Sequence, residues 1–232
     1  MKNRRTLVTV SGTACLLAVN WLTYIWAVNS GHIVEASLGY FINPLISVLL
    51  GVIVLRERLR PWQLIAIVVA AGGVLYLTVG YGSFPWIGLI LAFSFGFYGL
   101  FRKTASLSAI EGQSLEMALL FLPALTYLLF LEFSGTAAFG HAGFKTNTLL
   151  AFSGVITATP LLFFTSGARQ ITLTHVGLLQ YIAPTFQFLL GVLAYREPFT
   201  ATRWFGFSII WTALFIYTLE GVIRRQKAKR VP

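Results

Sequence analysis

The chain has 232 residues, of which 57% are hydrophobic and only 10% are charged, whereas average soluble domains have roughly 45–50% apolar and about 25% charged residues. This composition excludes an ordinary soluble domain, which needs far more polar surface to cover itself. The net charge of +10 would suit a nucleic-acid partner in a soluble protein. Here, however, the basic residues lie in short segments between apolar blocks, so we expect no nucleic-acid partner.

Apolar stretches long enough to cross a bilayer, which takes about 20 helical residues, follow one another along the chain. They predict membrane helices at residues 7–28, 33–55, 62–79, 84–101, 115–133, 148–166, 173–194 and 203–220. Turn-forming residues such as Asn29-Ser30-Gly31 and Glu197-Pro198 separate them. The apolar blocks are too continuous for alternating barrel strands. The predicted fold is therefore an all-α membrane protein, a polytopic helical bundle of about eight transmembrane helices.

The basic residues predict the orientation of this bundle. All but three of the 17 Lys and Arg residues lie on the side that holds the N-terminus, and the exceptions are Lys145, Arg196 and Arg203. Because cytoplasmic loops are enriched in Lys and Arg, both termini are predicted to be cytoplasmic. The basic tail, residues 223–232, is predicted to anchor the chain at the anionic leaflet, with about 1 kcal/mol for each basic residue.

An internal repeat connects the second and seventh predicted helices. Residues 38–57 match residues 178–197 without a gap, with nine of twenty positions identical. The shared residues include Pro44 with Pro184, and Arg56-Glu57 with Arg196-Glu197. The two helices are five apart in the predicted order, so they cross the membrane in opposite directions. Inverted repeats are typical of secondary transporters, whose substrate site lies near the midplane between the repeats.

The same repeat predicts how the chain is divided. Residues 1–82 hold three helices of a first repeat, residues 83–222 hold five helices of a second, and residues 223–232 form the basic cytoplasmic tail. A first repeat with five helices would begin well before Met1. We therefore expect a partial inverted 5+5 repeat in which about two helices are missing upstream.

Four strings of the sequence carry a resemblance to a known family: NWLTYIWAVNSGHIVEASLGYFINPL (20–45), VLRERLRPWQ (54–63), LAFSFGFYGLFRK (91–103) and TPLLFFTSGARQITLTHVGLLQYIAPT (159–185). They resemble the RarD-type permeases of the EamA branch of the drug/metabolite transporter superfamily. The resemblance runs from about residue 10 to residue 220. It implies a ten-helix bundle of two inverted five-helix repeats in the bacterial inner membrane. This sequence departs from that pattern by lacking the first two helices, which in the family help to form the central cavity.

Prolines and polar residues inside the predicted helices mark the candidate substrate site. A proline within a membrane helix removes one hydrogen bond and kinks the axis, and buried amides should point into the bundle because they are costly in hydrocarbon. The predicted substrate-binding residues are Asn20, Tyr24, Tyr40, Asn43, Pro44, Tyr98, Gln180, Tyr181 and Pro184. Alternatively, Asn43 and Gln180 only tie helices together, each for roughly 0.6–2 kcal/mol.

Charged residues near helix ends suggest gating and coupling roles. Arg56 and Glu57, with their repeat partners Arg196 and Glu197, are predicted to form a clamp or gate between helices. His32 and Glu35 are three residues apart near one helix end and are candidates for proton coupling.

The sequence predicts a secondary transporter that moves a small molecule by alternating access, with that molecule and the lipid bilayer as its partners. A non-transporting remnant or membrane partner protein stays open because of the missing helices. An intramembrane lipid-modifying enzyme is disfavoured, since the sequence has no HExxH motif, no aspartate and no Gly-rich phosphate loop. No catalytic residue, cofactor or metal site is predicted. Substrate identity, transport direction, coupling ion and oligomeric state stay open.

Overall fold

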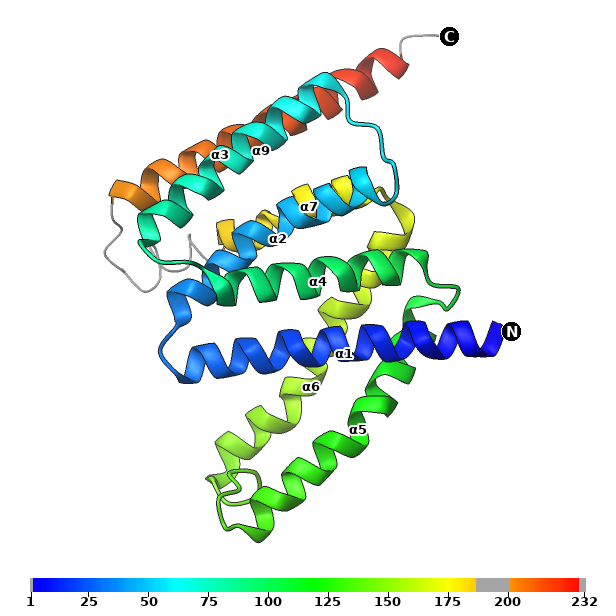
Figure 1. Cartoon of the computed structure of the whole chain (residues 1–232), viewed down its shortest axis with the longest axis vertical. Helices are drawn as coiled ribbons and strands as arrows, with labels where there is room; N and C mark the ends of the chain where they lie inside the picture. Colours follow the sequence, from blue (N-terminus) through cyan, green and yellow to red (C-terminus); the bar gives the residue numbers. More distant parts are fainter. Residues whose placement is uncertain (1, 187–200, 230–232) are drawn as a thin grey trace. The chain divides into compact units, whose positions relative to one another are not determined.

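The computed structural model describes residues 2–186 and 201–229, which are helical apart from short connections (Figure 1). The helices are α1 (Lys2–Asn29), α2 (Ile33–Ile53), α3 (Pro61–Tyr81), α4 (Trp86–Thr104), α5 (Ala109–Phe133), α6 (Gly143–Gln170), α7 (Leu173–Gln180) and α9 (Ala201–Lys229). Residues 182–186 are also helical, and no strand occurs in the described ranges. The predicted all-α membrane fold is confirmed.

Six of the described helices, α1, α2, α3, α5, α6 and α9, are long and apolar enough to cross a membrane. The seventh predicted span differs from the structure. The sequence predicts one helix over residues 173–194, but α7 ends at Gln180 and a turn at Tyr181 precedes the next helical residues. Pro184 contributes to the break, because a proline cannot donate a hydrogen bond to the carbonyl four residues earlier, although α2 is continuous through Pro44. Residues 187–194 lie outside the described residues.

The helices divide into two compact units. One holds the residues up to Ala18 together with Phe101–Ile171, and the other holds Val19–Leu100 together with the residues from Thr172 onward. In the first unit, α5 and α6 pack against each other. Gln113 of α5 donates a hydrogen bond from Nε2 to the carbonyl of Ala158 in α6, at 3.0 Å.

In the second unit, α3 and α9 lie side by side and antiparallel (Figure 1). Their backbones approach closely at two glycines. A Cβ atom on Gly73 would lie 2.9 Å from Ile210 Cγ1, and one on Gly206 would lie 2.4 Å from Leu77 Cδ2. Small residues at such crossings are the usual means of close packing between membrane helices. At one end of the pair, Arg60 Nη1 and Glu220 Oε1 form an ion pair at 2.8 Å.

Candidate functional site

The second half of α2 packs against α7, and the two helices run in opposite directions. A Cβ atom on Gly51, near the end of α2, would lie 3.3 Å from the Cβ atom of Leu173, at the start of α7. One on Gly177 would lie only 2.6 Å from the carbonyl oxygen of Pro44. Later residues of α2 thus meet earlier residues of α7. Opposite directions are what the inverted repeat requires of these two segments.

Two side-chain amides meet at this contact beside Pro44. Asn43 donates from Nδ2 to Gln180 Oε1 at 3.2 Å, and the hydroxyl of Ser47 donates to the same oxygen at 3.2 Å. Pro44 and Ser47 are almost completely buried. Ser47 was not among the predicted site residues, although its position four residues after Asn43 places it on the same face of α2.

Several polar atoms at this contact have no hydrogen-bond partner among residues 2–186 and 201–229. Among the described residues, none reaches Asn43 Oδ1, Gln180 Nε2 or the hydroxyl of Tyr181, and all three atoms are buried. A buried polar group without a partner costs about 1–3 kcal/mol, so such atoms are rare in proteins and call for an explanation. Two of the three belong to the amide pair itself.

The remaining predicted site residues lie on α1, on α4 and on either side of the amide pair. Asn20 donates from Nδ2 to the carbonyl of Leu91 and the hydroxyl of Ser94, each at 2.9 Å, and so ties α1 to α4. Tyr24 packs edge-to-face on Tyr40, with 6.1 Å between ring centroids. Tyr98 is completely buried on α4, and Pro184 is buried after the turn at Tyr181.

At the C-terminal end of α2, Glu57 holds the first turn of α7. Its Oε1 atom accepts from the backbone N–H of Leu173 at 2.6 Å, and its Oε2 atom accepts from the N–H and the hydroxyl of Thr174 at 2.9 and 2.7 Å. A carboxylate is favourable there because the first N–H groups of a helix lack partners and carry partial positive charge. Arg56 beside it is exposed, with a left-handed φ of 55°. Arg196 and Glu197 lie outside the described residues.

At the opposite end of α2, Glu35 is buried and holds the start of α4. It accepts from the N–H of Ile87 at 2.9 Å and from the hydroxyl of Tyr81 at 3.4 Å. His32 stacks on the ring of Trp26, with 5.4 Å between centroids. Proton coupling through His32 and Glu35 stays a prediction.

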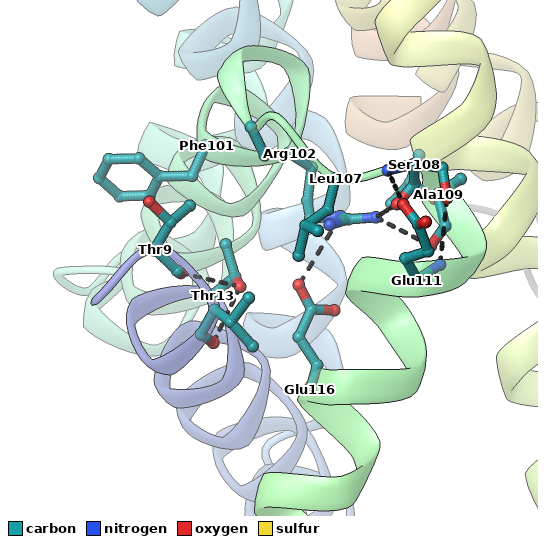
Figure 2. A network of polar contacts seen from close by, with 12 residues as sticks. Thr9, Thr13, Phe101, Arg102, Leu107, Ser108, Ala109, Glu111 and Glu116 are labelled. Atoms are coloured by element: carbon teal, nitrogen blue, oxygen red, sulfur yellow. Dashed lines mark hydrogen bonds and ion pairs between the residues drawn. The ribbon is translucent and has the colours of Figure 1, made fainter. Parts of the chain in front are cut away.

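A buried network around Arg102 in the first unit was not predicted (Figure 2). The Nη2 atom of Arg102 donates to the carbonyls of Ser108 and Ala109 at 3.1 and 2.9 Å. The Nε atom of Arg102 lies 3.6 Å from Glu116 Oε1. A Cβ atom on Gly112 would lie 1.7 Å from Arg102 Nη1, so this glycine makes room for the guanidinium group. From the sequence, Arg102 was only one of the basic residues predicted on the side that holds the N-terminus.

Two other basic residues of this unit, Lys103 and Arg169, also bind backbone carbonyls. Lys103 donates to the carbonyls of Ala168 and Ile171, and Arg169 donates to those of Ala105 and Leu107. A cavity of about 470 Å³ lies beside the α4–α5 connection and is lined by residues that include Arg5, Thr9, Thr13, Phe101, Arg102 and Leu107. Arg102, Lys103 and Arg169 therefore help to hold the connection between α4 and α5 in place.

Comparison with known proteins shows long and continuous similarity. The model of the EamA-like transporter family matches residues 2–79. Protein RarD of Streptomyces exfoliatus is 48% identical over 231 residues, which cover 99% of this chain and 73% of the relative. The uncharacterized transporter YojE of Bacillus subtilis is 48% identical over 214 residues, 92% of this chain and 71% of the relative. Protein RarD of Escherichia coli is 42% identical over 218 residues, 94% of this chain and 74% of the relative.

Proposed function

The chain belongs to the RarD-type permeases of the EamA-like transporter family and is therefore a multi-pass membrane transporter; from this we propose its mode of action. The protein moves a small, partly apolar molecule across the bacterial inner membrane by alternating access. The observation that carries this proposal is the antiparallel contact between α2 and α7, where Asn43 and Gln180, both partly buried, meet the buried Ser47. Polar side chains between membrane helices commonly mark a substrate pathway, and discontinuous helices of inverted repeats commonly form the site. Here α7 is interrupted at Tyr181, whereas α2 is continuous through Pro44.

Helix α2 has an arrangement that suits alternating access. The amide pair lies between two carboxylates that each hold the start of another helix. Glu35, at the predicted periplasmic end, binds α4, and Glu57, at the predicted cytoplasmic end, binds α7. In the proposed mechanism, the contacts at one end break while those at the other end stay closed, so that the site between them faces each side of the membrane in turn.

The Arg60–Glu220 ion pair belongs to the same cytoplasmic end. It joins the start of α3 to α9, close in sequence to Glu57. We assign it, together with Glu57 and Arg56, to the inner gate. Opening that gate requires two contacts to separate: the hydrogen bonds of Glu57 to α7 and the ion pair between Arg60 and Glu220. Both contacts are polar, so water that enters the open gate can hydrogen-bond to the separated groups and compensate for the lost contacts.

Transport by the purified chain tests this proposal. The chain is reconstituted into proteoliposomes and offered a broad panel of metabolites and drugs, and uptake is followed by mass spectrometry. We expect at least one compound to enter faster than in protein-free liposomes, and the Asn43→Leu/Gln180→Leu variant to lose that uptake while unfolding at a similar temperature. Equal uptake with and without protein across the whole panel would overturn the proposal.

A further inference from the structure

Among the residues that the structure describes, the amide pair leaves one hydrogen-bond acceptor and one donor unused. Asn43 keeps its Oδ1 atom and Gln180 keeps its Nε2 group, and within the described part of the chain neither has a partner. Oxygen and nitrogen of a side-chain amide can be exchanged by turning the group through 180°. If both amides were turned, Gln180 would donate to Asn43, and the pair would still leave one acceptor and one donor. The leftover pair is therefore independent of how the amides are oriented.

The amide pair, with both an unused donor and an unused acceptor, differs from a side chain that leaves a single atom without a partner. Gln113 of α5 also has a buried oxygen without a partner among the described residues, but its Nε2 group donates to Ala158. At the contact between α2 and α7, an unused acceptor and an unused donor come from two side chains that are already hydrogen-bonded to each other. The buried hydroxyl of Tyr181, the residue after Gln180, is a third polar group with no partner in the described ranges. Such a set offers a ligand several hydrogen bonds at once.

The α2 side of the pair is uncharged, and the described residues of α7 carry one titratable side chain, His175, five residues before Gln180. Residues 36–55, which include all of α2 after Glu35, contain no Lys, Arg, His, Asp or Glu. Aromatic side chains pack nearby in the same unit, where Phe41 contacts Phe207 edge-to-face at 5.1 Å between ring centroids. An ion placed there would lose its hydration without gaining an opposite charge, which costs far more than burying a neutral group that finds hydrogen bonds.

We propose that the contact between α2 and α7 binds an uncharged ligand that carries a hydrogen-bond donor beside an acceptor, as a carboxamide does. The ligand's carbonyl oxygen accepts from the amide of Gln180, and its N–H group donates to the amide oxygen of Asn43. This inference rests on the proposed function, because it specifies the substrate class of the same site. The unused atoms favour such a ligand, since binding it removes the cost of leaving them unpaired.

Matched pairs of small molecules test the inference by direct binding. The full chain in lipid nanodiscs is titrated with benzamide against benzoate, nicotinamide against nicotinate, and phenylacetamide against phenylacetate, at pH 7, where the acids are ionised. Binding is read by saturation-transfer NMR. We expect at least one amide to bind, and its carboxylate to bind at least about tenfold more weakly.

Variants connect the preference to the two amides. Asn43→Leu and Gln180→Leu should each weaken binding of the amide by about tenfold, the effect of losing a buried hydrogen bond, and should leave the weak binding of the carboxylate unchanged. Asn147→Ala is the control, because Asn147 lies outside the site and accepts from the N–H of Gly140 at 2.9 Å. It should bind the amide as the unchanged chain does.

The outcomes separate the two proposals. A carboxylate that binds as tightly as its amide overturns the inference, and so does the absence of amide binding by a chain that transports other compounds from the panel. If the panel shows no transport but amides bind and depend on Asn43 and Gln180, the transport proposal fails while the ligand class stands.

Discussion

Arg102 of α4 and Glu116 of α5 form an ion pair in which both side chains are buried, with 3.6 Å between Nε and Oε1 (Figure 2). Arg102 also binds the carbonyls of Ser108 and Ala109, so one guanidinium group holds both the turn before α5 and its second turn. Buried charges are stable only when they are paired and hydrogen-bonded. The pair therefore fixes how α5 leaves its connection to α4.

The ion pair gives a prediction about single and double variants. Glu116→Leu leaves Arg102 buried without its opposite charge, which should lower the free energy of unfolding by roughly 3–5 kcal/mol. The double variant Arg102→Leu/Glu116→Leu should lose less, because no lone charge remains buried. Unfolding of the unchanged chain, Glu116→Leu and the double variant in mixed detergent micelles gives the three free energies of unfolding to be compared. A double variant that is less stable than Glu116→Leu would contradict this account.

The close approach at Gly177 gives a second prediction. Gly177→Ala places a Cβ atom 2.6 Å from the carbonyl oxygen of Pro44, a backbone atom that cannot move without shifting α2. We expect a loss of roughly 1–3 kcal/mol in unfolding free energy, as for overpacking. Gly72→Ala on α3 is the matched control, since nothing lies within 4 Å of its added Cβ atom. Similar losses in both variants, measured by thermal unfolding, would show that α2 and α7 do not approach closely.

The contact between Glu57 and α7 gives a third prediction. Glu57→Ala removes the acceptor from the N–H groups of Leu173 and Thr174, which should destabilise the first turn of α7 by about 1–2 kcal/mol. Hydrogen exchange at these two amides should become faster, because their protection depends on this contact. Glu132→Ala is the control, since Glu132 is exposed and contacts His141. Unchanged exchange at residues 173 and 174 in Glu57→Ala would argue against the clamp.

The predicted orientation can be checked by labelling. In a Cys15→Ala background, Ser106→Cys lies in the connection before α5 and His141→Cys in the connection after it, with one membrane-spanning helix between them. An impermeant maleimide added to intact cells should label position 141, and position 106 only after the inner membrane is opened. Labelling of both positions from outside would show that α5 does not cross the membrane.

The succession of helices and their membrane character were predictable from the sequence alone, because a segment in lipid must satisfy its own backbone hydrogen bonds and about 20 apolar residues are needed to cross. The repeat, the prolines and the transporter family were also visible there, since each is a pattern along the chain. The seventh helix was less well predicted, because the turn at Tyr181 depends on how the chain adapts to Pro184.

Only the tertiary structure decided which polar groups meet. Asn43 and Gln180 are 137 residues apart, and nothing in their local sequence shows that they share a hydrogen bond or that each keeps one group unused. Nothing in the sequence around Arg102 and Glu116 shows that the two side chains are buried and paired with each other. The reason is physical: a membrane helix is apolar on all sides, so its periodicity does not reveal which face packs against a neighbour and which faces lipid.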